Sequence, residues 1–163
     1  MPIDDPRKLF AHKLGTALSS EKKILTQLKK MEREATRDEL RQQFAHHREE
    51  TEGQIRNIEQ AFETLGEKPT GHKNPTIDGL AEHADTMVGK VDETLVDAVL
   101  LGGAAETEHL EIAMYRSLIT QAEALGENDI VALLQENLEQ EEHTRDEVER
   151  AAQHVAQSAR TMV

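Results

Sequence analysis

Each of four apolar stripes along this sequence is interrupted by a charged or ionisable residue where a leucine would be expected. In the first stripe Glu21 falls between Ala17 and Ile24, and in the last stripe Glu141 follows Leu138. Ionised carboxylates that are buried together are costly unless cations compensate their charge. Glutamate oxygens and histidine nitrogens are ligands that iron and manganese accept readily. The interruptions therefore predict a buried metal site, and its candidate ligands are Glu21, His47, Glu50, Glu108, His109, Glu111 and Glu141.

Distances along the sequence predict that these residues lie at one level. Glu21 lies roughly 14 residues before the first expected turn, near residue 35, and Glu50 lies roughly 15 residues after it. Glu111 and Glu141 are each 15 residues from the second expected turn. Because every helical residue advances the chain by the same rise, equal spacing from a turn places residues of a hairpin side by side. This is the two-fold layout of an internal site for two metal ions.

The order of the ligands differs from that of most helical dimetal proteins. In these proteins each helical hairpin contributes one glutamate and a Glu-x-x-His pair. Here His47 and Glu50 have that spacing in reversed order, and Gln140 stands where a forward partner of His143 would lie. The predicted ligand set is therefore rich in carboxylates, which favours hard ions such as manganese or ferric iron. His109 stands beside these residues, but we expect its side chain to turn toward a flank.

Apolar residues recur at three- and four-residue spacing throughout, which predicts helices and no strands. Asp5-Pro6 is a plausible cap and first turn, and Thr36 with Glu39 has the pattern of a capping box. Gly126 is typical of a helix stop. Tyr115 is expected in the core with its hydroxyl bonded to a site carboxylate. The expected helices cover about residues 6–34, 37–65, 92–125 (with 96 as an alternative start) and 128–158.

The lengths of the connections predict the topology. The first and last links are only a few residues, so each pair of helices forms an antiparallel hairpin. The middle link, about residues 67–91, is long enough to return along a helix, and residues 77–88 could form a short helix within it. The sequence therefore predicts an all-α protein with a ferritin-like four-helix bundle, in one domain covering residues 1–163.

Composition excludes several classes of protein. The 163 residues include no cysteine, which removes disulfide scaffolds, zinc ribbons and thiol nucleophiles. The formal net charge of −13 argues against nucleic acid as a partner. No apolar run is long enough to cross a membrane, and the charged start lacks the apolar core of a signal peptide. We therefore expect a cytoplasmic protein with neither nucleic acid nor membrane as a partner.

Three short runs resemble the YciE/YciF-type ferritin-like family: Ser20–Lys22, Phe44–Gly53 and, most specifically, Glu108–Tyr115. The resemblance extends from about Leu9 to Val148. It implies a rubrerythrin-like bundle with a dimetal centre, in a bacterial or archaeal protein that is often dimeric and associated with stress. Its characteristic polar residues fall on Glu21, His47, Glu50, Glu108, His109, Glu111 and Glu141.

The leading hypothesis is a protein that binds two iron or manganese ions and reacts with peroxide or dioxygen during oxidative or general stress. The resemblance also implies a homodimer. One alternative is an enzyme on the same bundle, either a manganese catalase or a di-iron oxidase. Another is a metal-free helical adaptor or stress assembly protein, in which the carboxylates are only hydrogen-bonded. A site for metal ions separates the first two hypotheses from the third.

Overall fold

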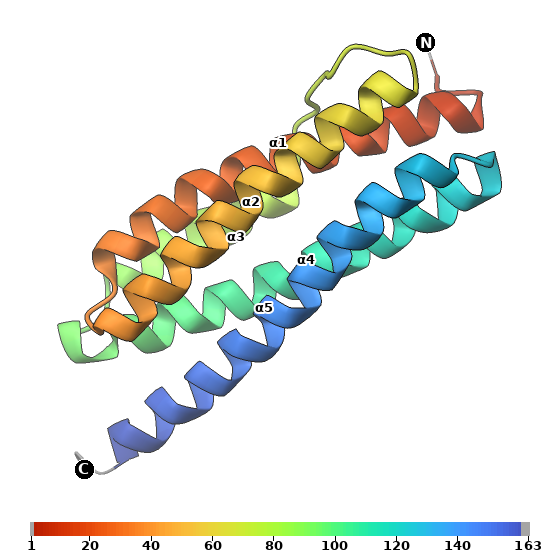
Figure 1. Ribbon diagram of the computed structural model, residues 1–163. Coiled ribbons are helices and arrows are strands. Elements are labelled where there is room, and N and C mark those ends of the chain that lie inside the picture. Colours follow the sequence, from red (N-terminus) through yellow and green to blue (C-terminus); the bar gives the residue numbers. More distant parts are fainter. Residues whose placement is uncertain (1, 161–163) are drawn as a thin grey trace.

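Five α-helices and one 3-10 turn make up the part of the chain that the computed structural model describes, residues 2–160. The four long helices form two antiparallel hairpins, α1 with α2 and α4 with α5, and α3 belongs to the segment that joins them (Figure 1). The all-α bundle with one long crossover, expected from the periodicity and the link lengths, is confirmed. The elements are α1 Pro6–Glu34, α2 Asp38–Thr64, α3 Pro75–Val88, η1 Glu93–Leu95, α4 Val96–Leu125 and α5 Asn128–Arg160.

Local sequence signals account for most of the helix ends. The Asp5 carboxylate accepts a hydrogen bond from the Lys8 backbone N–H at 3.0 Å, and Pro6 follows it in the first turn of α1. Gly126 ends α4 with a φ of 74°, a left-handed conformation that a residue with a Cβ rarely adopts. The next helix begins two residues later, so only Gly126 and Glu127 separate α4 from α5.

The start of α2 differs from the expected capping box. The N-cap residue is Arg37, and its side chain makes no capping hydrogen bond. The Thr36 backbone N–H and hydroxyl instead donate to the buried carboxylate of Asp97 at 2.7 and 2.6 Å. Arg37 adds an ion pair to the same carboxylate at 3.5 Å. The capping-box prediction is therefore wrong, because a carboxylate from the start of α4 outcompetes Glu39 for Thr36.

A polar layer divides the apolar core into two clusters. In α1, Glu21 lies between Leu18 of one cluster and Ile24 of the other. In α5, Glu141 lies between Leu138 and Val148 in the same way. Each cluster excludes water from one side of the layer, so the charged residues between them lie in a dry environment. Buried core residues include Phe10, Leu14, Ile58, Phe62, Leu118, Ile130 and Leu134 on one side and Leu28, Leu40, Phe44, Leu100 and Leu101 on the other.

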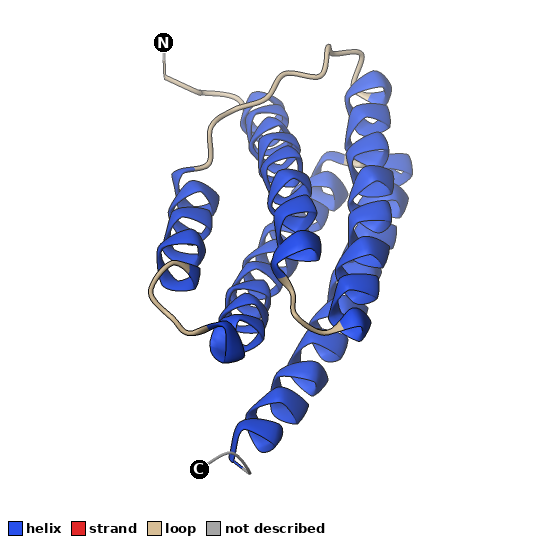
Figure 2. Cartoon of the chain, turned by 90° about the vertical axis from the view of Figure 1, so that its left-hand side faces the viewer, coloured by secondary structure: helices blue, strands red, loops and turns tan. Residues whose placement is uncertain are grey.

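The crossover lies closely against the bundle. The His72 backbone N–H donates to the Gly15 carbonyl of α1 at 2.9 Å. A Cβ at Gly15 would lie 2.2 Å from the Thr70 carbonyl oxygen, so only glycine permits this approach. The short helix α3 then lies outside the long helices, against α1 and α4 (Figure 2). None of the helices between residues 2 and 160 is both long and apolar enough to cross a membrane.

The Asp97 contacts predict the effect of removing its carboxylate. We expect Asp97→Ala to lower the free energy of unfolding by about 2 kcal/mol, because the N–H and hydroxyl of Thr36 lose a buried, charged acceptor. Chemical denaturation monitored by circular dichroism measures this. Glu106→Ala, an exposed glutamate on the same helix, is the control and should change stability little. Equal midpoints for the two variants would show that Asp97 does not hold the two hairpins together.

Candidate metal centre

Four helices each bring at least one ionisable side chain into the polar layer. Glu21 on α1 and Glu111 and Glu141 on α4 and α5 have no exposed surface, and Glu108 and His47 are only 2% and 4% exposed. Helical periodicity explains this placement, since each residue continues the apolar stripe of its own helix. The equal spacing from the two turns places them at one level, as the sequence counts predict. Glutamate is rarely buried without a partner, so this layer requires a compensating interaction.

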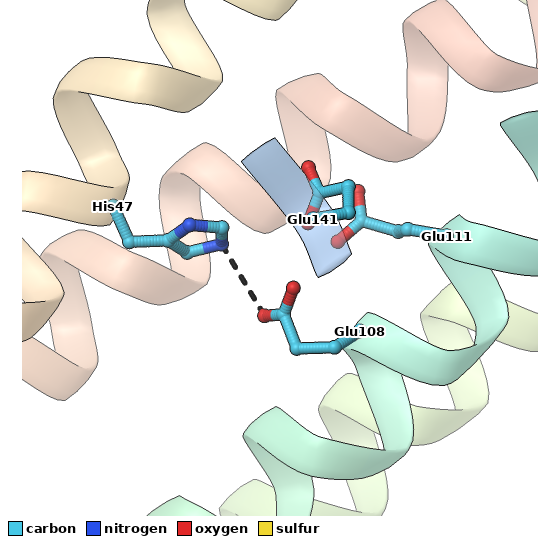
Figure 3. A group of neighbouring side chains, drawn as sticks. All are labelled: His47, Glu108, Glu111 and Glu141. Atoms are coloured by element: carbon cyan, nitrogen blue, oxygen red, sulfur yellow. Dashed lines mark ion pairs between the residues drawn. The ribbon is translucent and has the colours of Figure 1, made fainter. Parts of the chain in front are cut away.

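Four of these side chains could coordinate one ion together. His47, Glu108, Glu111 and Glu141 each offer a nitrogen or oxygen atom, and the four atoms lie within 4.8 Å of one another. Figure 3 shows the His47 ring directed toward Glu108, with the carboxylates of Glu111 and Glu141 beside them. The His47 Nε2 atom lies 3.3 Å from Glu108 Oε1. Oxygen and nitrogen atoms converging from α2, α4 and α5 form a group of the kind that binds a transition metal.

Glu21 lies next to this group and is held by Tyr115. The Tyr115 hydroxyl donates a short hydrogen bond to Glu21 Oε1, which confirms the expected bond between the tyrosine and a site carboxylate. The Asn137 side-chain amide donates to the tyrosine oxygen at 3.1 Å and accepts from Asn57 at 2.8 Å. Sequence reasoning missed Asn137. Its signal was available, because Asn137 interrupts the apolar stripe of α5 one turn before Glu141.

Glu50 lies at the edge of the layer that faces solvent. Its side chain is 18% exposed, and its carboxylate lies 3.7 Å from His47 Nδ1 and 3.5 Å from the exposed ring of His46. The Thr144 hydroxyl approaches it at 3.4 Å. Burial raises the pKa of Glu50, but the neighbouring imidazoles of His47 and His46 outweigh burial and lower its pKa overall. Glu50 therefore carries its negative charge next to His47, and it lies between the protein surface and the buried group.

His109 is the candidate that the structure does not bring to the layer. Its side chain is 60% exposed and its Nε2 atom lies 3.0 Å from Glu149 Oε1 on the outside of α4 and α5. Successive residues of a helix point about 100° apart, so His109 cannot face the same way as the buried Glu108. The expectation that this side chain turns toward a flank agrees with its position. The group that the structure gathers therefore consists of Glu21, His47, Glu50, Glu108, Glu111 and Glu141.

The buried carboxylates lack the partners that burial normally demands. Both oxygens of Glu111 and Glu141 and one oxygen each of Glu21 and Glu108 have no hydrogen-bond partner, nor has either ring nitrogen of His47. No lysine or arginine between residues 2 and 160 forms an ion pair with these four glutamates. Leaving such groups unpaired costs more than a lost hydrogen bond. A cation is the compensation that the protein itself does not supply.

Without a cation, the cluster retains protons. Burial and the charge of Glu141 raise the pKa of Glu21 from 4.5 to about 8, although the hydrogen bond from Tyr115 opposes this rise. The same two causes raise the pKa values of Glu108 and Glu111 well above the usual range. Burial raises the pKa of Tyr115 as well, so its hydroxyl remains a donor. Like charges this close cannot all ionise in a dry layer.

Two long helical hairpins with a carboxylate layer between them define a ferritin-like helical protein. Within that class, the chain belongs to the family described as Domain of unknown function (DUF892), whose model matches residues 5–160. It is 38% identical to Protein YciF of Escherichia coli (strain K12) over 138 residues, 83% of each chain. The resemblance to YciF-type proteins seen in the sequence is thereby confirmed.

Solved structures share the fold. The E. coli stress protein YciF superposes with a TM-score of 0.90 at 33% identity, covering 95% of this chain and 99% of that one. YcfI from Rhodopseudomonas palustris, described as a putative structural protein, superposes with a TM-score of 0.88 at 39% identity, covering 90% and 94%. A protein from Xanthomonas campestris (XCC3681), with a TM-score of 0.79 at 23% identity and coverage of 98% and 100%, supports the fold alone.

The raised pKa values predict how the metal-free protein responds to pH. Between 4.5 and about 8, folded Glu21 keeps a proton that the unfolded chain releases, so stability falls as pH rises through this window. We expect the melting temperature of chelator-treated protein to fall from pH 5 toward pH 9, as measured by differential scanning fluorimetry. Glu111→Gln should flatten this dependence, because the amide cannot ionise. The exposed control Glu106→Gln should leave the slope unchanged, and equal slopes for both variants would contradict the assignment.

Proposed function

We propose that this protein binds two divalent metal ions, iron or manganese, in the polar layer between its four long helices. The observation that carries the proposal is the set of buried carboxylate and imidazole atoms without partners. Hard oxygen donors with one nitrogen fit iron and manganese better than softer ions, and the chain has no thiolate to offer. The donors also come from both hairpins, as they do in other helical dimetal proteins.

The residues divide between the two ions by their position. His47, Glu108, Glu111 and Glu141 form the converging group that would hold one ion. Glu50 adjoins the His47 end of this group and Glu21 adjoins Glu111, so these two carboxylates extend the donor set toward a second ion. Tyr115 orients Glu21 through its hydroxyl, and Asn137 in turn orients Tyr115. Such outer contacts commonly set the affinity of the ligands they hold.

Metal binding would be coupled to proton release. The raised pKa values of Glu21, Glu108 and Glu111 mean that the empty layer holds protons at neutral pH. An incoming cation competes with these protons, so affinity should rise with pH. Bound iron or manganese would supply electrons for the reduction of peroxide or dioxygen. The apolar clusters on both sides of the layer exclude bulk water, and Glu50 keeps a negative charge at the solvent-facing edge.

The biological setting is a further part of the proposal. The E. coli relative YciF is described as a stress protein, and it covers nearly the whole of this chain. We infer a role for this protein in oxidative or general stress, as a homodimer in the cytoplasm. The same metal layer would suit a manganese catalase or a di-iron oxidase, and sustained oxygen release from peroxide would distinguish a catalase. YcfI is described as a putative structural protein, which suggests a metal-free role for that relative. Such a role would not explain the unpaired buried carboxylates of this chain.

Metal titration tests the proposal directly. We expect purified, chelator-treated protein to bind about two ferrous or manganous ions per chain under anaerobic conditions. Glu141→Ala and Glu111→Ala should abolish most of this binding, whereas His109→Ala, which removes an exposed imidazole from the same helix as Glu111, should not change it. Isothermal titration with elemental analysis gives the stoichiometry. Metal binding that survives both glutamate substitutions would contradict the proposal. A melting temperature of the metal-loaded protein that chelators do not change would also contradict it.

The contact between Tyr115 and Glu21 predicts a smaller effect. We expect Tyr115→Phe to weaken metal binding by about tenfold, because the ring still fills the core but no longer orients the carboxylate. Competition with a chromophoric chelator measures the affinity. Asn57→Ala, two hydrogen bonds further from Glu21 than Tyr115, should weaken it less. Wild-type affinity in Tyr115→Phe would show that Glu21 needs no orienting partner.

A further inference from the structure

A second feature adjoins the polar layer: a cavity of about 60 Å³ lined by residues of α1, α3 and α4, together with Phe44 and His47 of α2 and Val148 of α5. Its inner end reaches His47 and Glu108, on the side of the layer away from Tyr115. Most of its wall is apolar, and typical contributors are Leu28, Phe44, Ile77, Ala81, Leu100 and Ala104. We call this cavity the α3 chamber, because α3 supplies the wall that the four long helices lack.

Three charged residues, Lys30, Glu34 and Asp85, lie at the outer end of the α3 chamber. Lys30 of α1 forms an ion pair with Asp85 of α3 at 2.7 Å and a longer one with Glu34 at 3.7 Å. All three side chains are partly exposed, whereas Leu28, Leu100 and Ala104 are buried. The ion pair therefore links α1 to α3 at the surface. The buried wall of the chamber is mainly apolar, and Gln43, Thr107 and Thr144 are polar wall residues in addition to His47 and Glu108. Figure 2 shows α3 as a separate helix beside the bundle, held by loops at both ends.

Size and polarity limit what the chamber can hold. A water molecule needs roughly 10–15 Å³ of such volume together with two or more polar partners. A cavity lined by leucine, isoleucine and phenylalanine offers few partners, stays dry, and takes up apolar molecules or xenon. The volume of about 60 Å³ suits a molecule of a few heavy atoms and excludes a larger organic substrate. Charged molecules would lose most of their hydration against the apolar part of the wall, and polar partners come only from a few residues, among them His47 and Glu108.

We propose that the α3 chamber is a binding site for a small, uncharged, apolar molecule of the size of dioxygen, which reaches the His47–Glu108 side of the metal centre through it. The assignment of dioxygen rests on the proposed metal-binding function, whereas the apolar site itself does not. Hydrogen peroxide, which forms strong hydrogen bonds, has a polar approach through the partly exposed Glu50 and His46 instead. The two sides of the layer thus differ in the molecules that they admit.

Xenon tests the chamber without any metal. We expect metal-free protein under xenon pressure to hold one xenon atom in the chamber, seen by anomalous diffraction or as saturable shifts in NMR spectra. Ala104→Leu adds three carbon atoms to the buried wall and should abolish xenon binding. Ala113→Leu, the same substitution at an exposed position of α4, should not. Absence of xenon from the wild type, or xenon binding that Ala104→Leu leaves intact, overturns the proposal.

A second substitution tests the chamber if Ala104→Leu fails to fold. Ala84→Leu fills the chamber from α3, where the side chain is only half-buried and the helix can adjust. If Ala104→Leu does not fold, as judged by its melting curve, loss of xenon from folded Ala84→Leu supports the site and retention overturns it. Enlarging the chamber with Val148→Ala should increase xenon occupancy in the same assay.

Kinetics on the metal-loaded protein connects the chamber to dioxygen. In stopped-flow mixing of ferrous-loaded protein, Ala104→Leu or Ala84→Leu should slow oxidation by dioxygen by about tenfold and leave oxidation by peroxide unchanged. Equal slowing of both reactions overturns the assignment of dioxygen. The stoichiometry of bound iron, measured on the same samples, separates the two proposals. Xenon binding without any iron binding would refute the proposed metal function and keep the chamber, whereas iron binding without xenon would do the reverse.

Discussion

The main physical constraint on this structure is the free energy that it costs to bury four carboxylates in one layer from which water is excluded. Glu21, Glu108, Glu111 and Glu141 share a space that two apolar clusters close from either side. Ionised together they would repel, and relieving that repulsion by protonation requires pKa values raised well above the ordinary range of a glutamate. Two divalent cations would offset this cost, and binding them would then be thermodynamically linked to the folding of the bundle. A layer that is costly when empty is what a metal-dependent function needs.

The rest of the bundle keeps the two hairpins in register around this layer. Tyr115 on α4 reaches Glu21 on α1, and Asn137 on α5 reaches Asn57 on α2. Asp97 binds Thr36 far along the same interface. These polar contacts all cross from one hairpin to the other, where apolar packing alone would tolerate a shift along the helix axes. This register allows buried side chains from the two hairpins to converge within a few ångströms.

The crossover gives the layer two different sides. At the surface, Glu50 and His46 form a polar approach to His47. Beneath α3, the mainly apolar chamber extends to His47 and Glu108. At its outer end, the ion pair between Lys30 and Asp85 links α1 to α3. A long connection that only needed to return to the other end of the bundle would not require a helix of its own. Here the connection also completes a cavity.

Helical period and distance from the turns were enough to predict the fold, the common level of the buried carboxylates and the bond between Tyr115 and one of them. Both signals are local or additive, because each helical residue adds the same rise and rotation. The partner of Thr36, the part played by Asn137 and the chamber beneath α3 were decided only by tertiary structure. Thr36 has a local acceptor in Glu39 and a distant one in Asp97, and only the folded chain brings the distant one near. The chamber exists only because α3 packs across α1 and α4. Residue spacing along the chain does not predict how closely two such surfaces pack.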